Sequence, residues 1–229
     1  MKNYHTSKNQ TTRNTLFTAY VVALAVAFTV SLPQPTLAGK ITPPPVPANL
    51  QVPAGNKAFL KGHAVGTQQY FCLPCPNAST PAAMCPVSGL TWVQFGPQAT
   101  LFKDNGKQIL THFLSPNPEE NGTPRATWQD SKETSAVWAF ATPATTSTDP
   151  AFVAPGAIPW LRLEVVGVQD GPTGGDNLTA TTFIQRLNTS GGLAPSTGCT
   201  VSIDVGKKAL VPYTADYFFY EPAENDADD

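Results

Sequence analysis

Apart from His5, the chain carries two histidines, His63 and His112, and histidine is the side chain best suited to acid–base chemistry near neutral pH. Each lies in the middle of a stretch that is typical of a β-strand, so both imidazoles face one cavity if the two strands are neighbours. A carboxylate such as Asp130 would then complete an acid–base or metal site. The alternative, which we favour because no carboxylate stands at a diagnostic spacing, is a pair of hydrogen-bonded histidines near the core. His112, His63 and Asp130 are therefore the catalytic candidates.

Three further residues are candidates for binding a ligand: Trp128, Trp138 and Arg186. The two tryptophans flank one predicted turn, and on paired strands they would be cross-strand neighbours whose rings form a wall for a sugar or a small lipophilic ligand. Ordinary core packing is the alternative. Arg186 and Arg162 lie in apolar strands, where a buried guanidinium must find a partner, and Glu164 is that candidate partner for Arg162. An unknown small molecule, a glycan or a component of the cell envelope is the expected partner.

Four cysteines, Cys72, Cys75, Cys85 and Cys199, form a second group with chemical potential. A redox Cys-x-x-Cys site opens a helix in a βαβ unit, which this sequence lacks, and the spacing of the four is a poor match to zinc sites. An even number of cysteines in an exported chain favours two disulfides, for which three pairings exist. We favour Cys75 with Cys85, which closes a local loop, and Cys72 with Cys199, which ties an early strand to a late one.

Common catalytic and cofactor motifs are absent from the sequence. It contains no Gly-x-Ser-x-Gly, His-Glu-x-x-His or Gly-x-Gly-x-x-Gly. The stretch Gly171 to Asp176 superficially resembles a phosphate loop, but it lacks the Gly-Lys-Ser/Thr ending and no helix is predicted after it. We therefore expect no cofactor and no metal. Lys plus Arg number 14 against 16 Asp plus Glu, and this balance argues against a nucleic-acid partner.

Residues 1–38 have the parts of a secretory signal peptide. A basic region without acids precedes an apolar stretch from Leu16 to Leu32, and Thr36-Leu37-Ala38 places small residues where a signal peptidase cleaves. The alternative is a membrane anchor, because the stretch approaches the ~20 residues that a span needs. We favour cleavage, since Pro33 and Pro35 follow the apolar stretch, and expect no stable membrane span afterwards. The expected location is outside the cytoplasm, either extracellular or periplasmic.

Two segments flank the predicted domain, which covers residues 54–220. Residues 39–53 contain five prolines and predict an extended segment, either a stiff tether or a strap laid on the domain surface. Residues 221–229 contain five acids and predict a solvated, disordered tail.

The domain itself reads as all-β. Short apolar or alternating runs are separated by Gly, Pro, Asn and Asp, and no helical period stands out. About ten or eleven strands are predicted, over residues 59–65, 69–73, 90–95, 98–102, 108–114, 126–129, 135–141, 160–168, 179–187, 200–205 and 209–220. Asp104-Asn105-Gly106 is a strong hairpin signal, residues 130–133 are a second candidate turn, and the apolar run Tyr217 to Tyr220 indicates a strand covered on both faces. A single-domain barrel or a two-layer sandwich, with disulfides, satisfies this pattern.

Many segments, in order along the chain, also look familiar. They are Phe95–Phe102, Thr111–Phe113, Trp128–Trp138, Asp149–Trp160, Gly171–Asp176, Phe183–Thr189, Gly191–Cys199 and Val211–Tyr217. Together they resemble domain-of-unknown-function family 3455, secreted proteins of bacteria and fungi, over roughly Val52 to Tyr220. The resemblance implies export and one β-rich domain. It is consistent with a Cys72–Cys199 bridge, leaving Cys75 and Cys85 as an extra loop pair, and it implies no activity and no catalytic residue.

Two functional hypotheses follow from these patterns. The first is a secreted or envelope-associated, disulfide-stapled β-domain that binds something or has a structural role. The second is an enzyme, such as an isomerase, cyclase or hydrolase, using a barrel cavity lined by His112, His63 and tryptophans. A deep cavity with a carboxylate hydrogen-bonded to His112 would favour the enzyme, and histidines packed against hydrophobic side chains would favour binding or structure.

Overall fold

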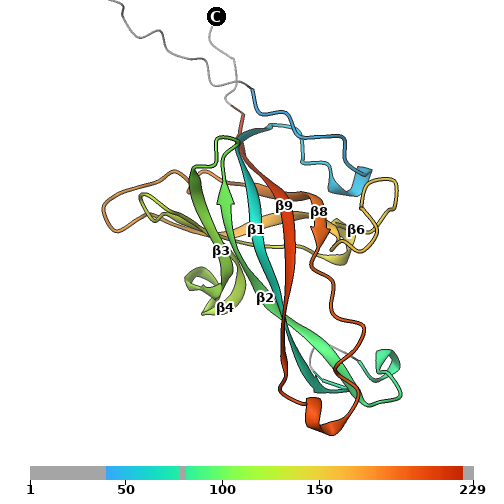
Figure 1. Ribbon diagram of the computed structural model, residues 1–229. Helices are drawn as coiled ribbons and strands as arrows, with labels where there is room; N and C mark the ends of the chain where they lie inside the picture. The colour runs from blue at the N-terminus through green and yellow to red at the C-terminus, as the bar shows by residue number, and fades with distance from the viewer. Residues whose placement is uncertain (1–39, 78–80, 224–229) are drawn as a thin grey trace, which may run out of the picture. The chain divides into compact units, whose positions relative to one another are not determined.

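The computed structural model describes residues 40–77 and 81–223 (Figure 1). Within these ranges the elements are nine strands and five short 3-10 turns. The strands are β1 (Asn56–Pro74), β2 (Leu90–Phe102), β3 (Gln108–Asn117), β4 (Thr123–Asp130), β5 (Ala136–Phe140), β6 (Thr146–Ser147), β7 (Trp160–Gln169), β8 (Phe183–Gly191) and β9 (Lys208–Pro222). No helix in the described ranges is long and apolar enough to cross a membrane. The predicted signal peptide (1–38) and the tail beyond residue 223 lie outside the described residues.

All nine strands belong to one antiparallel sheet that closes on itself. The order is β5-β4-β3-β2-β1-β9-β8-β7-β6, and β5 also pairs with β7, from Ala136 opposite Gln169 to Phe140 opposite Glu164. Eight strands therefore form a closed barrel, with β6 as an extra strand on β7. Closure gives every barrel strand two neighbours and removes the sheet edges. The all-β prediction is confirmed, and of the two predicted architectures the barrel is the one formed.

The strands are fewer and longer than the sequence patterns predict. The predicted strands 59–65 and 69–73 are one strand, β1, and 90–95 and 98–102 are likewise one strand, β2, with a bulge opposite Gln69/Tyr70. The predicted strand 200–205 is wrong. It contains the 3-10 turn Ser202–Asp204, because the Asp204 carboxylate accepts the backbone N–H groups of Thr200 (2.9 Å) and Val201 (3.1 Å) and so turns the chain.

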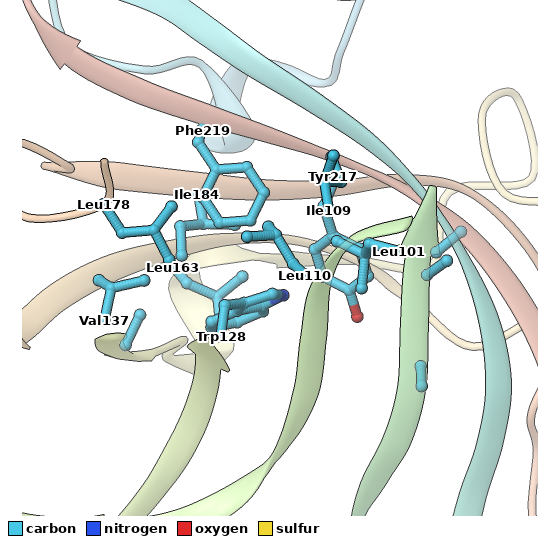
Figure 2. Close-up of a cluster of buried hydrophobic side chains, with 14 of the residues drawn as sticks. Leu101, Ile109, Leu110, Trp128, Val137, Leu163, Leu178, Ile184, Tyr217 and Phe219 are labelled. Carbon is cyan, nitrogen blue, oxygen red and sulfur yellow. The ribbon is translucent and has the colours of Figure 1, made fainter. Parts of the chain in front are cut away.

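Strand β9 shows how both faces of the sheet are covered. Tyr217 and Phe219 point into the barrel and pack with Leu110 and Ile184 in the interior core (Figure 2). Phe218 and Tyr220, on the alternate positions, are just as buried but lie on the outer face. The apolar run predicted to be covered on both sides is therefore covered on both sides, by two different clusters.

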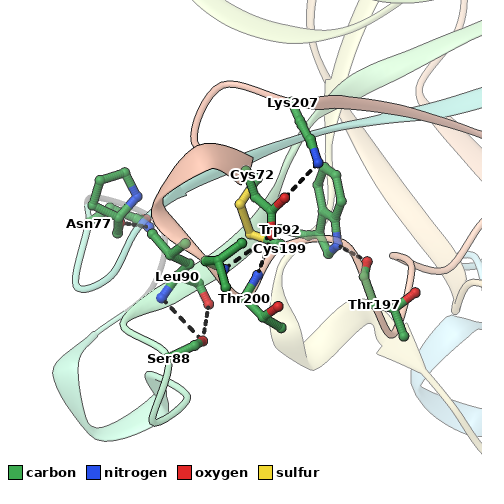
Figure 3. Close-up of a disulfide and its surroundings, with 12 residues drawn as sticks. Cys72, Asn77, Ser88, Leu90, Trp92, Thr197, Cys199, Thr200 and Lys207 are labelled. Atoms are coloured by element: carbon green, nitrogen blue, oxygen red, sulfur yellow. Dashed lines mark hydrogen bonds and ion pairs between the residues drawn. A yellow bond between two sulfur atoms is a disulfide. The ribbon is translucent and has the colours of Figure 1, made fainter.

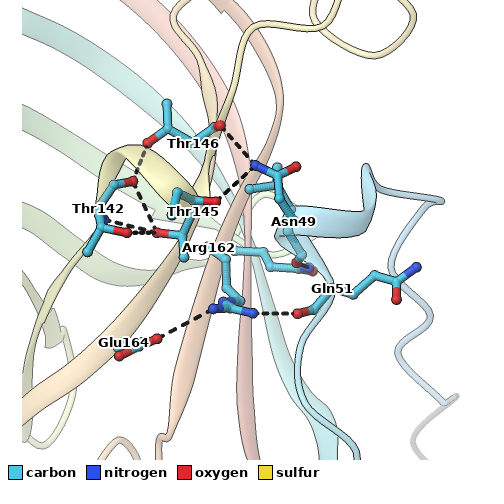
Figure 4. Close-up of polar contacts among 10 residues, drawn as sticks. Asn49, Gln51, Thr142, Thr145, Thr146, Arg162 and Glu164 are labelled. Atoms are coloured by element: carbon cyan, nitrogen blue, oxygen red, sulfur yellow. Dashed lines mark hydrogen bonds and ion pairs between the residues drawn. The ribbon is translucent and has the colours of Figure 1, made fainter.

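The cover on the outer face is the Pro-rich segment. Leu50 is fully buried against Phe218 and Leu187, and its carbonyl accepts from Gln185 Nε2 at 2.7 Å. Gln51 O accepts from Arg162 Nη1 at 2.7 Å (Figure 4). The segment is thus a strap on the barrel rather than a free tether. Arg162 also meets Glu164 at 3.4 Å, the partner predicted for it.

Beyond the barrel, β1 continues as the middle strand of a three-stranded arm. Its residues 67–74 pair with β2 on one side, and residues 67–71 pair with β9 on the other. Two disulfides fasten the tip of this arm, Cys72–Cys199 and Cys75–Cys85, which is the favoured pairing. Figure 3 shows the Cys72–Cys199 bridge and its surroundings. Cys72 and Cys199 are buried in a small cluster with Leu90, against which Trp92 packs.

The strap should contribute measurably to stability. Leu50→Ala empties a fully buried site and is expected to lower the free energy of unfolding by about 2–5 kcal/mol. The matched control is Leu210→Ala, because Leu210 is 54% exposed and its loss should cost no more than about 0.5 kcal/mol. Urea denaturation of both variants checks this, and equal midpoints would contradict a strap that holds the barrel.

The two disulfides should differ in what they contribute. In the chain-entropy model, the 127-residue separation of Cys72 and Cys199 corresponds to about 5 kcal/mol and the 10-residue separation of Cys75 and Cys85 to about 2.7 kcal/mol. We expect the Cys72→Ser/Cys199→Ser double variant to unfold at a clearly lower urea concentration than Cys75→Ser/Cys85→Ser. If the Cys75→Ser/Cys85→Ser variant unfolded at the lower urea concentration, packing at the tip of the arm, rather than loop length, would determine how much each disulfide stabilises the protein.

Candidate functional site

An open cavity of about 540 Å³ reaches into the barrel interior. Its wall includes four small residues, Gly96, Ala126, Ala139 and Ala141. Because interior positions alternate along each strand, the residue size at those positions decides where a barrel is filled and where it is open.

His112 lies in this cavity as a neutral hydrogen-bond acceptor. It is 3% exposed and stacks on Trp128 with ring centroids 4.1 Å apart and planes 8° apart. Its Nδ1 is 2.8 Å from the carbonyl oxygen of Thr127, which can only accept, so Nδ1 carries the proton and Nε2 has a lone pair. Burial lowers the pKa of His112 to about 3, and the nearby Arg186 charge acts in the same direction against the Thr127 hydrogen bond.

Arg186 is the charged group of the cavity. It is 9% exposed and lines the wall from β8. Its Nε and Nη2 donate to the carbonyl oxygen of Pro159 at 3.2 and 2.9 Å. Among the ion pairs of residues 40–77 and 81–223, none involves Arg186. Among the described residues, the Arg186 guanidinium is therefore hydrogen-bonded to a neutral carbonyl group and is not paired with a carboxylate.

Further polar groups share the wall. Gln68 is fully buried, and its Oε1 accepts from Gln94 at 2.7 Å, whereas its Nε2 is buried with no hydrogen-bond partner. Trp128 Nε1 is also buried and unpaired. Tyr217 lines the cavity too, and its hydroxyl lies 3.4 Å from that of Tyr213. Burial raises the pKa of both tyrosines although the Arg186 charge opposes the change, so both are protonated at neutral pH.

The three catalytic candidates do not come together. His112 lines the cavity, but His63 lies on the outer face of β1, where its partners are Asp216 and Asp104. Asp130 ends β4, and its Oδ1 accepts the backbone N–H groups of Lys132 and Glu133 at 2.7 and 3.0 Å. Alternate residues of a strand face opposite sides, so Ala64 in the interior core places His63 outside. The expectation that both histidines line one cavity is thereby corrected.

The ligand-binding candidates separate in the same way. Trp128 and Arg186 line the cavity, whereas Trp138 does not. Trp138 pairs with Thr127 and Trp128 with Val137, so the two indoles point to opposite faces of the sheet and are not cross-strand neighbours. On its own face, Trp138 Nε1 donates to Ser115 Oγ at 2.9 Å.

Two cavity residues were not singled out from the sequence, Gln68 and Tyr217. Gln68 could have been found from its position in β1. Side chains at alternate residues of a strand face the same side, and Gln68 is the polar residue among the inward-facing Gly62, Ala64, Gln68 and Tyr70. A buried glutamine on an inward face indicates a polar interior. Tyr217 is part of the apolar run and gives no separate signal.

The glycine-rich loop has a packing role. A Cβ atom on Gly171 would lie 1.8 Å from the Glu133 carbonyl oxygen, and one on Gly175 would lie 1.7 Å from the Glu133 side chain. The loop therefore needs glycine at these positions in order to close over the β4–β5 turn. Elsewhere in the structured part of the chain, no group of three or more His, Cys, Asp or Glu side chains is arranged to hold a metal ion.

His63 forms a charged clamp on the outside of the barrel. Its Nδ1 lies 2.5 Å from Asp216 Oδ1, and its Nε2 contacts Asp104 in the β2–β3 turn. Since carboxylates only accept, both ring nitrogens donate and the imidazolium form is favoured. The hydrogen bond to Asp104, with help from Asp216, raises the pKa of His63 above 6.5, against partial burial and the charge of Lys61.

The clamp predicts a pH-dependent contribution to stability. Because the folded pKa of His63 is raised, its contribution is complete below the unfolded value of 6.5 and is lost as the pH rises through the folded pKa. The difference in unfolding free energy between wild type and His63→Gln should therefore be larger at about pH 5.5 than at about pH 8.5. Urea titrations at both pH values measure it, and a difference that does not change with pH would rule out the charged clamp.

Comparison with known proteins places the chain in a family. No match is found among the curated proteins or among the solved structures. Residues 53–221 match the family model described as "Protein of unknown function (DUF3455)". This match covers the whole barrel and its arm, well over half of the sequence. The chain therefore belongs to the DUF3455 family of proteins of unknown function.

Proposed function

We propose that this protein is exported and binds a small molecule in the cavity that holds His112 and Arg186. Export is supported by the signal-peptide pattern of residues 1–38 and by two disulfides, which form and persist in oxidising compartments. A binding role is supported by the cavity, whose volume of about 540 Å³ falls in the range usual for ligand sites.

The observation that carries the proposal is the buried charge on the cavity wall. Arg186 is 9% exposed, lines the cavity and donates to a backbone carbonyl, and no carboxylate pairs with it among the described residues. A buried charge without an ionic partner costs stability. A domain selected for stability alone would pair or replace it, whereas a binding site keeps it for its ligand.

The enzyme alternative has less support. Within the described ranges, His112 donates to a backbone carbonyl and forms no hydrogen bond with a carboxylate. The cavity holds neither His63 nor Trp138. The remaining groups on the cavity wall suit recognition: they are a permanent cation, a neutral acceptor and aromatic rings.

The cavity mouth offers a test. Leu114 lines the cavity and is 38% exposed beside Gly96, so Leu114→Trp should narrow the entrance without overfilling the core. The matched control is Leu210→Trp, on an exposed position outside the cavity. Two fluorescent probes are titrated, 8-anilinonaphthalene-1-sulfonate and its neutral analogue N-phenyl-1-naphthylamine.

We expect wild type and Leu210→Trp to bind at least one probe, and Leu114→Trp to bind it about tenfold more weakly or less. Melting temperatures of the three proteins confirm that each is folded before titration. Binding that is the same in Leu114→Trp and in the control would place the probe elsewhere and contradict the proposal, as would no binding of either probe to wild type.

A further inference from the structure

The charge inside the cavity has no counterpart in the protein. Guanidinium is protonated at any physiological pH, and two of its five N–H groups are used by Pro159 O. The ionisable neighbours that sense the Arg186 charge are His112, Tyr70, Tyr213 and Tyr217. All four are neutral at neutral pH, so none of them supplies a negative charge. A buried positive charge that faces only dipoles would be stabilised by an anion that enters the cavity.

The number of free charges limits what enters. Arg125 also lies on the cavity wall, but Glu120 holds it by two hydrogen bonds, Nε–Oε2 at 2.7 Å and Nη2–Oε1 at 2.6 Å. Arg186 is therefore the single uncompensated cation on the wall formed by the described residues. A ligand with one negative charge neutralises it, whereas a phosphate monoester with two would bring an unpaired charge into the same cavity.

The rest of the wall defines the body of the ligand. Apolar side chains of Leu161, Leu163 and Phe140 surround the space together with the Trp128 and Tyr217 rings. A flat apolar or aromatic body fits such a wall. His112 Nε2 offers an acceptor to a hydroxyl or N–H group of the ligand.

We propose that the cavity selects a small organic monoanion, a carboxylate or sulfonate on an aromatic or otherwise flat apolar body, and that Arg186 pairs with its charged group. This inference rests on the proposed function, because it names the class of ligand for the same cavity. In this proposal the charge of Arg186 provides much of the binding affinity, and the aromatic and aliphatic side chains of the cavity wall select the shape of the ligand.

The probe pair already introduced tests the charge directly, because the two molecules share one ring system and differ by a sulfonate. Both are titrated into wild type, Arg186→Met and Arg186→Lys in buffer of low chloride, since chloride is itself a monoanion. Arg186→Met removes the charge and keeps much of the side-chain length. Arg186→Lys keeps the charge and is the matched control. Circular dichroism and melting temperature establish that each variant is folded.

We expect wild type to bind the sulfonate at least about tenfold more tightly than the neutral analogue. Arg186→Met should lose that preference by weakening sulfonate binding about tenfold, with neutral binding changed by less than about twofold, and Arg186→Lys should keep a preference for the sulfonate. Arg186→Met is also expected to melt at a higher temperature than the ligand-free wild type, because an unbalanced buried charge is removed.

Failure of this inference and failure of the proposed function give different results. If Leu114→Trp weakens both probes but Arg186→Met alters neither, the cavity binds ligands and the charge selection is overturned. If Leu114→Trp alters neither probe, the cavity is not the binding site, and the monoanion proposal falls with it.

Discussion

The hydrogen bonds between β5 and β7 are the constraint on which the rest of the structure depends. β5 is only five residues long, yet it carries β4 on one side and β7 on the other and so joins the two ends of the sheet. Without that contact the sheet would be open, and the inward side chains of β3 and β4 would have no opposite wall in β7 and β8. Closure places four small residues, Gly96, Ala126, Ala139 and Ala141, on the wall of one cavity. It also takes His112 and Arg186, whose strands are far apart in the sheet order, to the wall of the same cavity.

The charged groups of the barrel are paired differently on its two faces. Outside, charges meet in complementary pairs, such as His63 with its two aspartates and Arg162 with Glu164. Inside, the Arg186 charge and the neutral His112 ring meet carbonyl oxygens and aromatic rings instead. Unpaired buried polar atoms occur on both faces, since Trp160 Nε1 and Arg162 Nε lack hydrogen-bond partners as do Gln68 Nε2 and Trp128 Nε1. The strap adds hydrogen bonds on the outer face, where its carbonyls accept from Gln185 and Arg162.

Much of the fold was predictable from short-range patterns, because these are local. The Asn105-Gly106 turn joins β2 to β3, the polar turn after Asp130 joins β4 to β5, and the run Tyr217–Tyr220 is covered on both faces.

The site was less predictable, because it depends on the register of the strands, and a shift of one residue sends a side chain to the other face of the sheet. That is why Trp128 and Trp138 separate, and why His63 lies outside while Gln68 lies inside. The sequence indicates that Arg186 needs a partner, but it cannot indicate that this partner is the backbone carbonyl of Pro159, because every residue has a backbone carbonyl. β5 and β7 are separated by the nineteen residues 141–159, so the contact that closes the barrel gives no local signal in the sequence.

The arm that leaves the barrel has a consequence for how the chain avoids its own copies. Among the described residues, β2 has no strand neighbour before Ala99 on the β3 side, and β9 has none before Tyr213 on the β8 side, so two strand edges of the arm are unpaired. Unpaired edges recruit other strands and seed aggregates. Each of these edges carries a proline, Pro97 opposite Gln68 and Pro212 opposite Thr67, and the β9 edge begins with Lys208. A proline interrupts the row of donors and a lysine repels an incoming strand, so the arm extends as a sheet whose growth is blocked on both sides.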